Sequence, residues 1–179
     1  MKSQPQRFAS LTLVLAAIGT VSAQAQQGAP TWGGLRFGMT EAEVRSVLGA
    51  KMLKPEPGPE NQPDGEISHL FAAGVVRELS VKWFEGHANL MFDKGSKRLS
   101  LVTLWLEPQK SLSDQAKINA CSRFSDDLVK KYGPPVLVKE SSSIFRSGGQ
   151  SIDVFVSARD GIPAIIFITY EPTNSAKGF

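Results

Sequence analysis

The sequence has 179 residues, of which 20 are basic and 17 acidic, and its formal net charge at neutral pH is +3. Two basic residues, Lys2 and Arg7, belong to a leader that we expect to be removed; because the rest is close to neutral and lacks a basic run with interleaved aromatic residues, we expect no nucleic-acid partner. The single cysteine, Cys121, excludes an internal disulfide and a zinc site built from paired cysteines.

Residues 1–25 predict a cleaved secretory signal peptide. A short basic start precedes the apolar run 11–18, which is too short to span a bilayer, and Ala23-Gln24-Ala25 has the small-x-small pattern of a signal-peptidase site. A membrane anchor is the alternative, but no stop-transfer pattern follows the run, and no cysteine follows it to carry a lipid. We therefore expect a periplasmic or secreted protein, cleaved near Ala25 and without a stable membrane anchor.

The stretch 34–49 (GLRFGMTEAEVRSVLG) is either a ligand-binding loop or the start of a helix. Thr40 and Glu43 have the spacing of a capping box, and Gly49 follows the apolar stripe of the helix as a terminator. A phosphate-binding loop would need more glycines or a lysine at the turn. The stretch therefore predicts a capped helix.

Residues 54–65 hold four prolines and predict a long exposed loop. Such a loop is a candidate contact or flap region, although most are plain connectors. The alternation then changes to a period of two, which predicts strands at 79–83, 88–93 and 98–106, with turns at 85–87 and 93–96 and a further strand at 67–72 before Gly74.

The second half repeats this order. The cap-like spacing of Ser111-Leu112-Ser113-Asp114 predicts the start of a second helix that ends at Gly133, with Cys121 on its apolar stripe. Strands are expected at 136–139, 143–146, 151–157 and 162–170. The expected organisation is a flexible lead at 26–31, one helix-plus-sheet unit at 32–107, a second at 108–171, and a loose tail at 172–179.

These elements predict an α+β fold in which the helices pack on one face of an antiparallel sheet. The shared order of the two halves leaves open two tandem helix-then-strands repeats.

The residues Gly38, Met39, Thr40, Glu43, Val44 and Gly49 form a stretch, FGMTEAEVRSVLG, that resembles a known domain start. It resembles the opening of small outer-membrane assembly lipoproteins of SmpA/OmlA type (BamE-like), and it is similar to the repeat openings of β-lactamase inhibitor proteins. The resemblance implies a protein-binding sheet in the cell envelope.

Catalytic signatures are missing from the sequence. It contains no Gly-x-Ser-x-Gly elbow and no phosphate-binding loop, and Cys121 is expected to face the core as an unreactive thiol. We therefore expect a non-enzymatic protein without a cofactor. The alternative is a small metal-binding protein or hydrolase that uses His87, Glu85 and His69.

The sheet should leave one face uncovered by helices, and several strands are apolar on both faces. The pattern predicts an aromatic binding face, formed by Phe84, Met91, Trp105, Phe155 and Phe167. The expected function is an exported module that binds a protein or another envelope component through this face; a homodimer paired along sheet edges is a further alternative.

Overall fold

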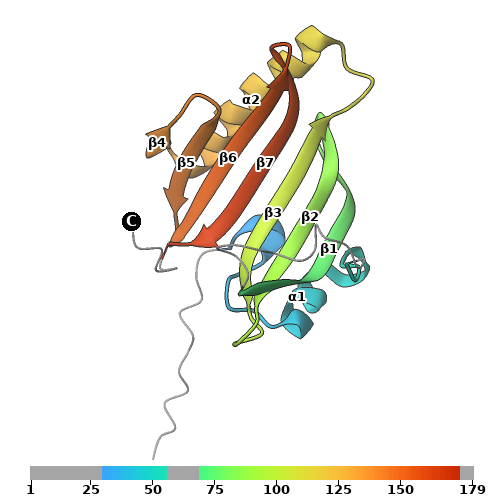
Figure 1. Cartoon of the computed structure of the whole chain (residues 1–179), viewed down its shortest axis with the longest axis vertical. Helices are drawn as coiled ribbons and strands as arrows, with labels where there is room; N and C mark the ends of the chain where they lie inside the picture. Colours follow the sequence, from blue (N-terminus) through green and yellow to red (C-terminus); the bar gives the residue numbers. More distant parts are fainter. Residues whose placement is uncertain (1–29, 56–68, 174–179) are drawn as a thin grey trace, which may run out of the picture.

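The computed structural model describes residues 30–55 and 69–173. Its centre is one seven-stranded antiparallel sheet with the order β1-β2-β3-β7-β6-β5-β4 (Figure 1). The strands are β1 (Leu70–Val81), β2 (Phe84–Asp93), β3 (Leu99–Pro108), β4 (Leu137–Val138), β5 (Ser142–Ser147), β6 (Gln150–Arg159) and β7 (Ile162–Pro172). The helices are η1 (Trp32–Gly34), α1 (Glu41–Leu48), η2 (Gly49–Lys51) and α2 (Asp114–Tyr132).

The predicted α+β fold with a layer of helices on the sheet is wrong, because the sheet dominates the molecule. Five of the strands have 10 to 12 residues, whereas the two α-helices have 8 and 19. A helix is about 10 Å wide and strands lie about 4.8 Å apart, so each helix covers only two or three strands. Accordingly, α2 packs behind the β5–β7 side of the sheet, and the short α1 lies near one end of β1–β3 (Figure 1).

Both α-helices begin and end where the sequence predicts. Thr40 caps α1: its hydroxyl accepts a hydrogen bond from the Glu43 amide (3.3 Å), and the Glu43 carboxylate accepts one from the Thr40 amide (2.7 Å). The capping box is confirmed, and a ligand is not needed to explain the stretch. Ser113 caps α2 through a single bond, in which its hydroxyl accepts from the Ala116 amide (3.3 Å), and α2 ends at Gly133 with φ +82°.

The first hairpin differs from its prediction. The two strands expected at 67–72 and 79–83 form one strand, β1, and the turn lies at Lys82 and Trp83, so the turn expected at 85–87 is wrong. Lys82 has φ +52°, where Gly or Asn is usual in a two-residue turn, so the sequence carries no turn signal there. Lys82 also forms a salt bridge with Asp127, which ties this turn to α2.

The core lies between the helices and one face of the sheet. Alternate residues of each long strand point into it: Phe84, Ala88, Leu90 and Phe92 from β2, Val102, Leu104 and Leu106 from β3, and Ile166, Ile168 and Tyr170 from β7. Val44 of α1 and Leu128 of α2 belong to the same cluster, so both helices lie on this side of the sheet. Neither helix, in the part of the chain that the structure describes, is long and apolar enough to cross a membrane.

One continuous sheet crosses the boundary expected at residue 107. The last strand of the first unit, β3, pairs with the last strand of the second, β7, from Val102↔Tyr170 to Leu106↔Ile166. The expected signal peptide, and all of the proline-rich loop beyond Pro55, lie outside the described residues.

Candidate binding site

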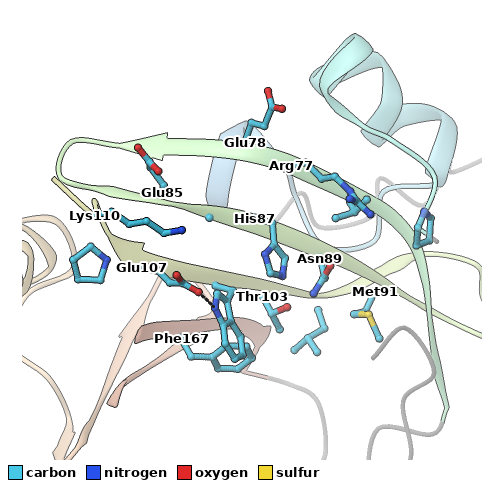
Figure 2. Close-up of a pocket in the computed structure, with 16 residues that line it drawn as sticks. Arg77, Glu78, Glu85, His87, Asn89, Met91, Thr103, Glu107, Lys110 and Phe167 are labelled. Carbon is cyan, nitrogen blue, oxygen red and sulfur yellow. Dashed lines mark hydrogen bonds between the residues drawn. The ribbon is translucent and has the colours of Figure 1, made fainter. Parts of the chain in front are cut away.

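The face of the sheet turned away from both α-helices, called the open face below, is hollowed over β1, β2, β3 and β7 (Figure 2). The hollow has a volume of about 820 Å³, within the usual range of ligand pockets. Its floor and walls include Val75, Arg77, Glu78, Glu85, His87, Asn89, Met91, Leu101, Thr103, Trp105, Glu107, Lys110 and Phe167.

An aromatic row crosses the open face on four adjacent strands. His87, Trp105, Phe167 and Phe155 are successive register partners on β2, β3, β7 and β6. The His87 and Trp105 rings are nearly parallel, with centroids 6.2 Å apart, and Phe167 meets Trp105 edge to face at 6.0 Å. The indole of Trp105 is held in place because its Nε1–H donates a hydrogen bond to Glu107 (3.2 Å).

A polar row lies next to the aromatic row, two residues along each strand. Asn89, Thr103, Thr169 and Asp153 are register partners on the same four strands. Asn89 and Thr103 line the hollow, and Asn89 points toward it beside His87 (Figure 2). The open face thus presents rings and polar groups side by side, and all of the polar groups except Asp153 are neutral.

Charged residues of both signs surround these rows. A bulge in β1 between Val76 and Leu79 brings Arg77 and Glu78 to the hollow, where Glu78 has φ +54°. Glu85 and Glu107 are direct partners across β2 and β3, and Lys110 extends over the same end of the hollow (Figure 2). The hollow therefore has no strong excess of one charge.

The surroundings of His87 favour its neutral form at neutral pH. Burial lowers the pKa of its imidazole, the nearby Arg77 lowers the pKa further, and Glu107 opposes both with a smaller effect. At neutral pH the ring therefore belongs with the aromatic residues of the hollow, and it offers one N–H donor and one acceptor.

The predicted binding residues divide between the two faces. Trp105 and Phe155 are on the open face and are 37% and 44% exposed, and Phe167 is half-buried beside them. Met91 is on this face but is only 7% exposed, because it packs with Leu70 and Leu101.

The prediction that Phe84 lies on the open face was wrong. Phe84 is fully buried and packs edge to face against Phe124 of α2, with ring centroids 5.3 Å apart. The misplaced turn caused this error. A turn at 85–87 would put Phe84 at the end of the first strand, whereas Phe84 is the first residue of β2, and this difference changes the face of the sheet on which its side chain lies.

The residues of the alternative metal site do not come together. Glu85 and His87 share the open face of β2, but His69 precedes β1 near Asp93, six residues further along β2 and thus roughly 20 Å from His87. Among the described residues, no group of three or more His, Cys, Asp or Glu side chains could hold a metal ion. Cys121 is half-buried, and burial raises its thiol pKa, which favours the unreactive protonated form.

Sequence reasoning missed the polar half of the site. The sequence pattern did not lead us to predict a binding function for four residues that line the hollow: Asn89, Thr103, Arg77 and Lys110. Asn89 and Thr103 nevertheless alternate with buried residues at a period of two. That alternation was the available signal, and it becomes informative once the turn is placed at Lys82 and Trp83.

The comparisons with protein-family models, with curated proteins and with solved structures each find no match to this chain. The resemblance to envelope assembly lipoproteins and to β-lactamase inhibitor proteins therefore stays a prediction.

Proposed function

We propose that this chain is an exported binding module that contacts a protein or another envelope component through the open face. One observation carries the proposal: the hollow of about 820 Å³ has the exposed Trp105 in its floor. Aromatic side chains exposed in a concave surface are the groups that contribute most to binding energy when a partner buries them.

The composition of the hollow supports binding more than chemistry. Most of its floor is built from the interior strands β2, β3 and β7, which hold side chains in fixed positions before a ligand arrives and so reduce the entropic cost of binding. Within the part of the chain that the structure describes, no hydrogen bond joins its carboxylates to a thiol or a hydroxyl nucleophile. Export is the second part of the proposal and rests on the leader sequence at 1–25.

The metal-dependent alternative has weaker support. It requires a third ligand near Glu85 and His87, and within residues 30–55 and 69–173 the structure supplies no suitable group. Metal analysis of the purified protein tests it directly: stoichiometric metal that is lost in His87→Ala would favour this alternative over the binding module.

Photo-cross-linking in living bacteria tests the proposed function. A photo-reactive amino acid is placed at Glu85 or Lys110, which are exposed residues at the hollow, and for comparison at Lys130 of α2 or Val138 of β4. We expect adducts with envelope components from the hollow positions only, and we expect Trp105→Ala to abolish them.

Two results would contradict the proposal. One is an equal adduct pattern from the hollow and the comparison positions, because this would indicate collisions rather than a site. The other is an adduct pattern at Glu85 and Lys110 that Trp105→Ala leaves unchanged.

A further inference from the structure

We propose that the ligand of the hollow is a neutral glycan chain, which lies across β2, β3, β7 and β6 along the aromatic and polar rows. This inference rests on the proposed function and adds the chemical class of the ligand.

The first argument is the arrangement of the two rows. Strands lie about 4.8 Å apart, so four register partners span about 14 Å, and the two rows are separated by about 7 Å along the strands. The aromatic row is His87, Trp105, Phe167 and Phe155, and the polar row is Asn89, Thr103, Thr169 and Asp153. A sugar ring has an apolar face of C–H groups and an edge of hydroxyl groups, so a chain of sugars can place faces on one row and edges on the other.

The second argument is the state of the indole. Trp105 already uses its N–H in the hydrogen bond to Glu107, so the ring offers a partner its π surface rather than a polar group. The contact with Phe167 and the parallel His87 ring limit its rotation. A fixed, partly exposed ring in a floor of neighbouring rings suits stacking against an apolar ring face.

The third argument distinguishes a glycan from an extended peptide. A peptide commonly binds a sheet by adding a strand at its edge, where backbone groups are unpaired. The hollow lies over β2, β3 and β7, which are each paired on both sides, and over the edge strand β1. Where β1 lines the hollow at Val75, its outer backbone groups already pair with those of Leu53. The open face offers side chains only, and the hydroxyl and amide groups of Thr103, Thr169 and Asn89 match the hydroxyl groups of a sugar.

The fourth argument is charge. Seven of the eight residues in the two rows are uncharged at neutral pH, and Asp153 is the exception. Around the hollow, Arg77 and Lys110 accompany Glu78, Glu85 and Glu107, so a polymer with many charges of one sign would meet repulsion somewhere along the site. A neutral chain meets no such repulsion.

Calorimetric titration with two neutral tetrasaccharides, tetra-N-acetylchitotetraose and cellotetraose, tests this inference on the mature protein. We expect at least one to bind with one-to-one stoichiometry and a Kd that changes less than about twofold between 50 mM and 500 mM salt, because the ligand is uncharged. Trp105→Ala should weaken binding about tenfold or more, and Trp105→Phe should weaken it less, because a ring remains.

The polar row has its own matched pair of variants. Thr103→Val removes a hydroxyl in the hollow with little change of shape and should weaken binding severalfold. Thr173→Val makes the same change at an exposed site beyond β7 and should leave the Kd unchanged. Circular dichroism of each variant verifies that the fold is retained.

The outcomes separate this inference from the proposed function. If neither tetrasaccharide binds but Trp105-dependent adducts with a protein form at Glu85 and Lys110, the glycan inference fails and the binding module stands. Binding that survives both Trp105→Ala and Thr103→Val would place the sugar elsewhere and would also overturn the inference. If neither adducts nor sugar binding is found, both proposals fail.

Discussion

At the scale of single residues, the position of His87 in the sheet determines its charge. Its ring lies parallel to that of Trp105 in the hollow, and burial together with Arg77 keeps its pKa below the usual value. Protonation would place a second positive charge beside Arg77 in a partly desolvated site, so the neutral ring is favoured.

This shift predicts how stability depends on pH. The pKa of a histidine in the unfolded chain is about 6.5, and the pKa of His87 in the folded protein is lower. As the pH falls through this range, the unfolded state therefore binds more protons than the folded state. We therefore expect the wild-type protein to lose stability relative to His87→Gln between about pH 7.5 and pH 5. Urea unfolding of both proteins across this range measures the difference. A difference that stays constant, or that changes in favour of the wild type in acid, would contradict the assignment.

Phenylalanines on the two faces of the sheet should differ strongly in their effect on stability. Phe84→Ala removes a fully buried ring and is expected to lower the free energy of unfolding by about 3–5 kcal/mol. Phe155→Ala truncates a ring that is 44% exposed on the open face and should cost about 1 kcal/mol or less. Denaturant unfolding measures both, and equal losses would show that the faces are wrongly assigned.

At the scale of elements, Gly86 shows that a glycine can allow two strands to pair closely instead of forming a turn. Gly86 lies inside β2 opposite Leu106. A Cβ atom at this position would lie 1.8 Å from the carbonyl oxygen of Trp105, so only glycine allows β2 and β3 to approach as they do. The same contact positions the strand segments that carry His87 and Trp105.

Adding a methyl group at Gly86 should therefore force β2 and β3 apart. We expect Gly86→Ala to destabilise the protein by about 2–3 kcal/mol, as overpacking of a close contact usually does. Gly95→Ala is the matched control, because a Cβ there would meet only the Asp93 carboxylate at 3.4 Å, and it should change stability by less than about 0.5 kcal/mol. If thermal and denaturant unfolding show the two variants to be equally stable, the close approach of the strands is not as described.

At the scale of the whole molecule, the pairing of β3 with β7 joins the two halves into one sheet. The hollow depends on this pairing, because Trp105 comes from the first half and Phe167 from the second. The core cluster likewise includes residues from both halves, such as Val44 and Phe145. Separating the two halves would expose to water apolar side chains that are now buried, which costs free energy.

The two halves should consequently unfold together. The three tryptophans, Trp32, Trp83 and Trp105, all lie in the first half, whereas the single cysteine lies on α2 in the second. We expect tryptophan fluorescence and the reactivity of the Cys121 thiol to follow one transition with the same midpoint in urea. Two separated midpoints would indicate that the halves are independently stable units.

Local interactions are the part of this fold that the sequence predicts well. The helix starts at Thr40 and Ser113 and the stops at Gly49 and Gly133 each depend on groups only a few residues apart, so the sequence contains the whole interaction. The general positions of most strands also follow from their alternation. The class of the fold did not follow, because the share of the sheet that the helices cover depends on how many strands join it.

The sequence by itself determined the capped helices and the positions of most strands, since each depends on neighbours along the chain. It also identified Trp105, Phe155 and Phe167 as aromatic residues of strands. Only the tertiary structure decided which face each strand buries and which residues share the hollow. A turn at Lys82 and Trp83 without a turn sequence placed Phe84 in the core, and pairing across β2, β3 and β7 brought His87, Trp105 and Phe167 together. Strand register is a non-local property, because a shift of one residue exchanges the two faces of a sheet.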